Sequence, residues 1–165
     1  MSNINKSIIK MKDELIQKRR QQTMASGYKT TINSNHMCAI LDTCGNPLIY
    51  GTNVFNTKTP TTEHAEAQAL RKMLEKYSYE KRKFKVDILV IRTNGNNSKP
   101  CARCINEMER LRGRLQIRNV YYTHEDEKYG IRCVKFCKLV DEPDKHYSSY
   151  DRNIKKYFEL NKNKK

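Results

Sequence analysis

Two cysteines, Cys101 and Cys104, stand three positions apart directly after Pro100. Proline suits the first turn of a helix, and residues three apart in a helix share one face. The positive end of the helix dipole lowers the pKa of a thiol, and both redox chemistry and metal binding use the thiolate. The pair therefore fits a redox dithiol, half of a structural zinc knuckle, or part of a catalytic metal site.

Other residues of the sequence bear on these three alternatives. A structural zinc knuckle needs a second close pair of ligands, and the sequence contains no second C-x-x-C motif. A thioredoxin-like dithiol is expected after the first strand, whereas this pair follows the third expected strand, at 85–94. We interpret the remaining cysteines as small, half-buried side chains; they are Cys38, Cys44, Cys133 and Cys137.

A catalytic metal site needs one further ligand, and His64 in the segment His64-Ala65-Glu66 can supply it. The order H-x-E followed by P-C-x-x-C is the signature of zinc-dependent nucleobase deaminases. With both motifs at expected helix starts and strands between them, the chain resembles the cytidine/deoxycytidylate deaminase superfamily over residues 36–140.

The resemblance implies a zinc ion held by His64, Cys101 and Cys104, with Glu66 as the catalytic proton shuttle. Three protein ligands leave a fourth position for water, as in catalytic zinc sites. Zinc makes hydroxide available near neutral pH. The implied reaction is hydrolytic deamination of a cytosine-type nucleoside or nucleotide to its uracil form, with release of ammonia.

Three substrate-binding residues are also suggested. By resemblance, Asn53 contacts the sugar, although an asparagine at a strand end also caps turns. The resemblance further implies that the backbone of Ala65 approaches the amide edge of the base. Phe55 is a candidate to stack on the base, with a core aromatic as the alternative.

Apolar periodicity predicts an alternation of helices and strands. The residues Ile4, Ile8, Met11 and Leu15 recur at helical spacing and predict an amphipathic N-terminal helix that docks on the core or on a partner. The further expected elements are strands at 36–42 and 48–55 forming a hairpin, a helix at 64–80, a strand at 85–94, a helix from Pro100 to Gly113, and strands at 115–124 and 130–140.

This order predicts an α/β fold. The apolar run Ile88–Ile91 indicates a strand buried on both faces, and helices on both faces imply a three-layer α/β/α sandwich. The link between 115–124 and 130–140 is too short for a crossover helix, so these strands should be antiparallel. With the resemblance, we expect a cytidine deaminase-like, five-stranded mixed sheet whose last two strands are antiparallel.

We expect three regions along the chain: a basic amphipathic helix and loop at 1–35, the catalytic domain at 36–140, and a basic tail at 141–165. The sequence has no apolar run long enough for a transmembrane helix and no secretory leader pattern. We therefore expect a cytoplasmic protein, or a nuclear one, without a membrane partner. The resemblance also implies a homo-oligomer.

The formal charge of +15 over 165 residues attracts anions. It leaves nucleic acid open as a partner beside a small nucleoside or nucleotide. By resemblance, an antiparallel last strand pair is typical of free-nucleoside deaminases, but those enzymes usually carry C-A-E and three cysteines. A polynucleotide-editing deaminase and a non-catalytic zinc-containing binding module therefore stand as alternatives.

Overall fold

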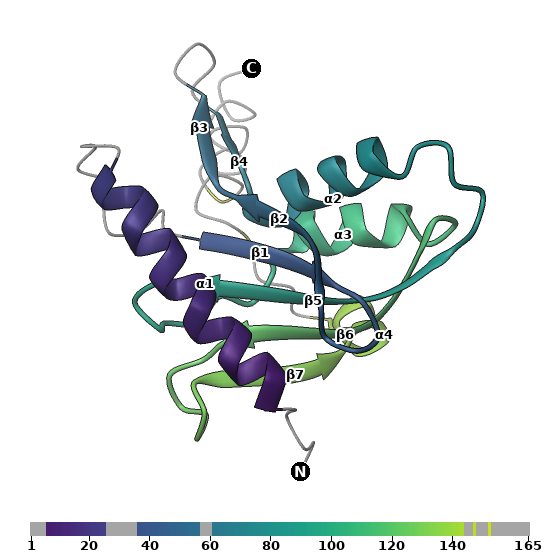
Figure 1. The fold of residues 1–165 in the computed structure, drawn as a ribbon. Coiled ribbons are helices and arrows are strands. Elements are labelled where there is room, and N and C mark those ends of the chain that lie inside the picture. Colours follow the sequence, from purple (N-terminus) through teal and green to yellow (C-terminus); the bar gives the residue numbers. More distant parts are fainter. Residues whose placement is uncertain (1–5, 26–35, 57–60, 144–146, 148–151, 153–165) are drawn as a thin grey trace, which may run out of the picture.

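A mixed five-stranded sheet in the order β2-β1-β5-β6-β7 lies at the centre of the protein (Figure 1). In this computed structural model the described residues are 6–25, 36–56, 61–143, 147 and 152. The strands of the main sheet are β1 (His36–Leu41), β2 (Pro47–Thr52), β5 (Phe84–Arg92), β6 (Leu115–Thr123) and β7 (Ile131–Lys135). The remaining elements are β3 (Val54–Asn56) and β4 (Thr61–Glu63), which form a separate two-stranded sheet, and helices α1 (Lys6–Ala25), α2 (Ala65–Lys76), α3 (Ala102–Arg110) and α4 (Phe136–Val140).

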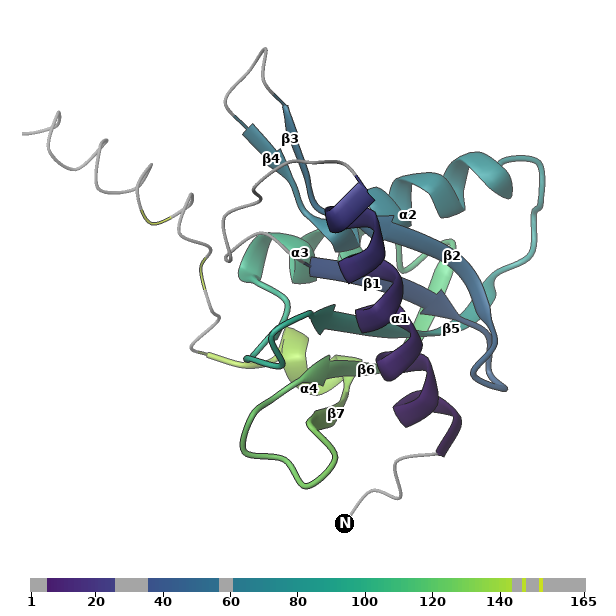
Figure 2. The same ribbon diagram turned by 60° about the vertical axis from the view of Figure 1, so that its left-hand side comes forward.

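The strand directions confirm the predicted sheet. β1 is antiparallel to both β2 and β5, β5 is parallel to β6, and β7 is antiparallel to β6. Helices α2 and α3 lie side by side on one face of the sheet, while α1 crosses the other face (Figures 1 and 2). The expected three-layer α/β/α sandwich is therefore the observed fold.

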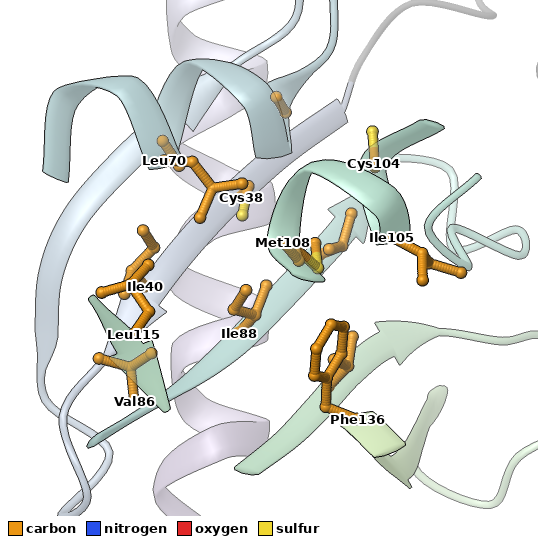
Figure 3. Packing of buried hydrophobic residues seen from close by; sticks show 14 of the residues in the cluster. Cys38, Ile40, Leu70, Val86, Ile88, Cys104, Ile105, Met108, Leu115 and Phe136 are labelled. Atoms are coloured by element: carbon orange, nitrogen blue, oxygen red, sulfur yellow. The ribbon is translucent and has the colours of Figure 1, made fainter. Parts of the chain in front are cut away.

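The central strand β5 builds two hydrophobic cores because its side chains alternate between the faces. Val86, Ile88 and Val90 join the cluster beneath α2 and α3, whose packing is shown in Figure 3. Leu89 and Ile91 join the cluster beneath α1. As predicted from its apolar run, β5 is thus buried on both faces.

The N-terminal helix α1 docks on the sheet through its apolar stripe. Ile8 and Leu15 are buried in the second core, and Met11 packs against them. At the other end of the helix, the Arg20 guanidinium donates a hydrogen bond to the carbonyl of Thr93 at 3.0 Å. The helix therefore reaches the loop that follows β5.

Two of the predicted strands are interrupted within their expected ranges. The segment 130–140, predicted as one strand, changes at Phe136 from β7 to the short helix α4. Phe136 and Leu139 are both buried, and this three-residue spacing places them on one face of a helix rather than on opposite faces of a strand. Cys137 consequently lies on α4 and does not share a strand with Cys133.

The predicted hairpin strand 48–55 is also interrupted, since β2 ends at Thr52 and β3 begins a separate sheet. The boundaries 1–35, 36–140 and 141–165 stay predictions, and most of the expected tail lies outside the described residues. Among the described helices, none is long and apolar enough to cross a membrane.

Strand β2 and helix α2 are in close contact at Gly51. A Cβ atom built on this glycine would lie 2.2 Å from the Ala65 carbonyl oxygen and 2.6 Å from the Ala69 nitrogen. Both are backbone atoms that cannot rotate away. Only glycine lets the first turn of α2 approach the strand this closely.

Replacing Gly51 by alanine should therefore push α2 away from the sheet. We expect the free energy of unfolding to fall by about 1–3 kcal/mol, the range for overpacking, in chemical denaturation. Gly113→Ala is the matched control, because a Cβ there meets nothing within 4 Å. Equal stability of the two variants would contradict the close-approach explanation.

Candidate active site

The two predicted motifs begin two helices in the same way. His64 is the N-cap of α2, with φ −71° and ψ 151°, and Cys101 is the N-cap of α3, with φ −75° and ψ 166°. Neither side chain makes the usual capping hydrogen bond to its own helix. Both are therefore available for another partner at the positive ends of the two helix dipoles.

Cys104 lies in the first turn of α3, three residues after Cys101. Side chains at the N-cap and three residues later approach each other, as in a capping box. The two sulfur atoms are accordingly 3.6 Å apart. Pro100, predicted in the first helical turn, instead precedes the N-cap, because α3 begins at Ala102.

The His64 ring lies beside both sulfur atoms, so that three ligand atoms form a triangle. Its Nδ1 atom lies 3.2 Å from Cys104 Sγ and 3.5 Å from Cys101 Sγ. Zinc bonds of about 2.0–2.1 Å to nitrogen and about 2.3 Å to sulfur, in tetrahedral geometry, separate such atoms by about 3.5 Å and about 3.8 Å. The three side chains therefore fit a zinc ion and form a metal-binding group.

The contacts among the three ligands shift the pKa values of the two thiols in opposite directions. The sulfur–sulfur hydrogen bond, followed by the contact with His64, lowers the pKa of Cys101 to about 4. The same sulfur–sulfur contact, together with burial, raises the pKa of Cys104. Thiols bind zinc as thiolates, so metal binding at this site is coupled to the release of protons.

Glu66 lies in the first turn of α2, close to the three ligand side chains. Its side chain is 4% exposed, and in the described part of the chain its Oε2 atom has no hydrogen-bond partner. Burial raises its pKa, while its own backbone N–H and His64 favour the charged form. A buried, unpaired carboxylate oxygen is costly and typical of a functional group.

The loop between β5 and α3 is held by two buried hydroxyl groups. Ser98 Oγ donates to the Val90 carbonyl and accepts from the Thr123 N–H, both at 2.9 Å. Thr123 Oγ1 donates to the Asn96 carbonyl at 2.8 Å and accepts from the Arg92 N–H at 3.1 Å. These bonds anchor the segment that leads into Cys101.

The predicted substrate contact Asn53 lies at the end of β2. Its Oδ1 atom accepts hydrogen bonds from the His36 N–H at 3.1 Å and from Arg19 Nη2 at 3.4 Å. His36, Arg19 and Arg92 were not among the site residues predicted from the sequence. No local motif points to these three residues, since they come together only through the docking of α1 and the pairing of β1 with β5.

The structure describes the side chain of Ala65 but not that of Phe55, the other two predicted substrate contacts. Ala65 is fully buried as the first residue of α2, directly between His64 and Glu66. Phe55 lies in β3, where its backbone pairs with Thr62, but its side chain is outside the described part of the structure. The substrate roles of both residues stay predictions.

Comparison with known proteins agrees with this geometry. Residues 10–123, more than half of the chain, match the family described as "Cytidine and deoxycytidylate deaminase zinc-binding region". The chain belongs to this family, and His64, Cys101 and Cys104 are its zinc-binding group. A search of curated proteins gives no significant match.

The fold is shared with a solved cytidine deaminase structure. A cytidine deaminase from Burkholderia pseudomallei is 23% identical, with a TM-score of 0.54, over 80% of this chain and 94% of that chain. A dCMP deaminase from the cyanophage S-TIM5 is 19% identical, with a TM-score of 0.45, over 73% of this chain and 93% of that chain. At these identities the likeness concerns the fold and leaves the substrate open.

The purified protein should contain a single zinc ion, measurable by elemental analysis. Cys104→Ser should lose most of this zinc, because a neutral hydroxyl replaces a thiolate ligand. Removing zinc with a chelator should lower the melting temperature of the unaltered protein. Cys137→Ser, at an exposed position on α4, is the control. Full zinc content in Cys104→Ser would contradict the assignment.

Ser98→Ala should lower the free energy of unfolding by about 1–3 kcal/mol, because it leaves the Thr123 N–H and the Val90 carbonyl without their buried partner. Chemical denaturation of the zinc-loaded protein measures this change. Ser78→Ala, at an exposed turn position, should have little effect. A stability equal to that of Ser78→Ala would remove Ser98 as the anchor of the loop.

Proposed function

We propose that the protein catalyses the zinc-dependent hydrolytic deamination of a cytosine-type nucleoside or nucleotide, releasing ammonia and the uracil form. The observation that carries this proposal is the buried Glu66 carboxylate beside the three zinc ligands, with its Oε2 atom unpaired in the described structure. When bound, zinc supplies the Lewis acidity that makes hydroxide available from water near neutral pH.

Glu66 transfers protons between the water and the substrate during the proposed reaction. Its carboxylate accepts a proton from the attacking water and delivers it to the ring nitrogen next to the amino-bearing carbon. The second proton of the water goes to the amino group, which leaves as ammonia. The carbon–nitrogen bond breaks, a carbon–oxygen bond forms, and Glu66 returns to its starting form.

The environment of Glu66 suits this exchange. Burial, the largest influence, raises the pKa of its carboxyl group and so increases its affinity for the proton. His64, close enough to act electrostatically, favours the charged form that accepts the proton. The two influences on the pKa of Glu66 thus oppose each other: burial favours the protonated carboxyl group and His64 favours the carboxylate.

Asn53 is proposed to orient the substrate through its amide nitrogen. Its Oδ1 atom is already occupied by the His36 N–H, while in the described structure Nδ2 has no partner. Nδ2 is a donor and suits a sugar hydroxyl or carbonyl oxygen of the substrate. We further propose that the backbone of Ala65 and the ring of Phe55 contact the base.

The antiparallel pairing of β7 with β6 supports a small free substrate, since the resemblance associates this arrangement with free-nucleoside deaminases. The buried Glu66 supports an enzyme over a non-catalytic zinc module. A zinc scaffold gains nothing from a buried carboxylate with an unpaired oxygen, which costs folding free energy.

Glu66→Gln should retain zinc and lower kcat by about 10²–10⁴-fold, the usual contribution of general acid–base catalysis. Ammonia release from cytidine, deoxycytidine and their 5′-monophosphates measures this. Glu75→Gln is the matched control, because Glu75 lies exposed on the same helix. Absence of turnover with every compound in the zinc-loaded protein, or full activity of Glu66→Gln, would refute the proposal.

A further inference from the structure

A histidine–arginine pair lies at the edge of the sheet where the zinc-binding helices begin. His36 starts β1, Arg92 ends β5, and the two residues are directly paired across the strands. Their neighbours two positions along, Cys38 and Val90, belong to the core beneath α2 and α3. Because side chains alternate along a strand, His36 and Arg92 face the zinc-binding layer.

The contact between the two side chains orients the guanidinium. Arg92 Nε donates to His36 Nε2 at 2.6 Å, which requires a neutral imidazole. Burial, then the charges of Arg92, His64 and Arg19, lower the pKa of His36 to about 4. His36 therefore acts as an uncharged acceptor, close enough to His64 for the two rings to interact electrostatically.

In the described part of the chain, Arg92 has no carboxylate as a direct ion-pair partner. Glu125 acts on it only through space. Its Nη1 and Nη2 atoms have no hydrogen-bond partner in the same part of the structure. Partial burial lowers its pKa, yet a guanidinium stays protonated.

A second guanidinium lies next to the same residues. Arg19, from the last turns of α1, reaches within 3.4 Å of Asn53 Oδ1 with its Nη2 atom. That oxygen also binds the His36 backbone, so the two arginines are linked through His36 and Asn53. The proposed sugar contact is therefore linked by hydrogen bonds to Arg19 directly and to Arg92 through His36.

We propose that Arg92, with Arg19 beside it, binds a phosphate group attached to the sugar of the target nucleoside. A guanidinium presents two parallel N–H groups that match two phosphate oxygens, and a partly buried charge strengthens that bond. The proposal deepens the proposed function and rests on it. The substrate is then a phosphorylated nucleoside, and Arg92 distinguishes it from the bare nucleoside.

The test compares kcat/KM for deoxycytidine and cytidine with kcat/KM for their 5′-monophosphates. The unaltered enzyme should prefer the monophosphates, and Arg92→Gln should lower the ratio of monophosphate to nucleoside by about 10–100-fold, as expected for a lost charged hydrogen bond. Arg112→Gln, exposed beyond the far end of α3, should keep the ratio unchanged. An unchanged ratio in Arg92→Gln overturns the proposal.

A binding experiment separates this proposal from the proposed chemistry. Zinc-loaded Glu66→Gln should bind the monophosphates more tightly than the nucleosides in calorimetry, and the additional Arg92→Gln substitution should abolish that difference. This readout needs no turnover. If nothing is deaminated but the Arg92-dependent difference persists, the proposed reaction fails and the phosphate site stands; equal affinities overturn the phosphate site.

The phosphate could belong to a free nucleotide or to a polynucleotide strand. A short single-stranded oligonucleotide containing one cytosine therefore runs beside the monophosphates in the same assay. Arg92-dependent conversion of either substrate supports the phosphate site and identifies the source. Conversion of the oligonucleotide that does not depend on Arg92 assigns its phosphates to another surface and overturns the proposal.

Discussion

The convergence of two helix N-termini is the constraint on which the rest of the structure depends. Three ligand atoms from α2 and α3 must lie within 4.8 Å of one another. The position of α2 is set by its backbone contact with Gly51, and the position of α3 by the loop anchored through Ser98. Both supports act on backbone atoms, so the ligand side chains need little freedom of their own.

The same convergence places costly groups together. Two buried thiols, one of them with a lowered pKa, lie near a buried carboxylate. Each ionised group loses hydration there, and an uncompensated buried charge destabilises the fold. A divalent cation with one imidazole and two thiolates compensates these charges, so metal binding and folding are coupled at this site.

Much of this site could be predicted because its parts are local. The H-x-E and C-x-x-C spacings determine how side chains meet within one helical turn, and the apolar run in β5 indicates a strand buried on both faces. The Arg92–His36 contact joins residues 56 positions apart and depends on the register of β1 against β5. The break at Phe136 depends on which core its side chain enters. Neither has a signature in the local sequence.

The net charge of the chain says little about the ligand of the site, because it does not show which basic residues come together in the fold. The chain has 33 basic residues, and several of them form ion pairs within the protein. Arg71 pairs with Glu63 and Glu75, and Arg118 pairs with the buried Asp87. Exposed charges are also screened beyond about 10 Å at 0.1 M salt. Arg92 differs because it is partly buried and its guanidinium is oriented by an uncharged histidine. If Arg92 and its neighbour Arg19 bind phosphate as proposed, the anion preference of the site should persist at salt concentrations that abolish attraction to the surface as a whole.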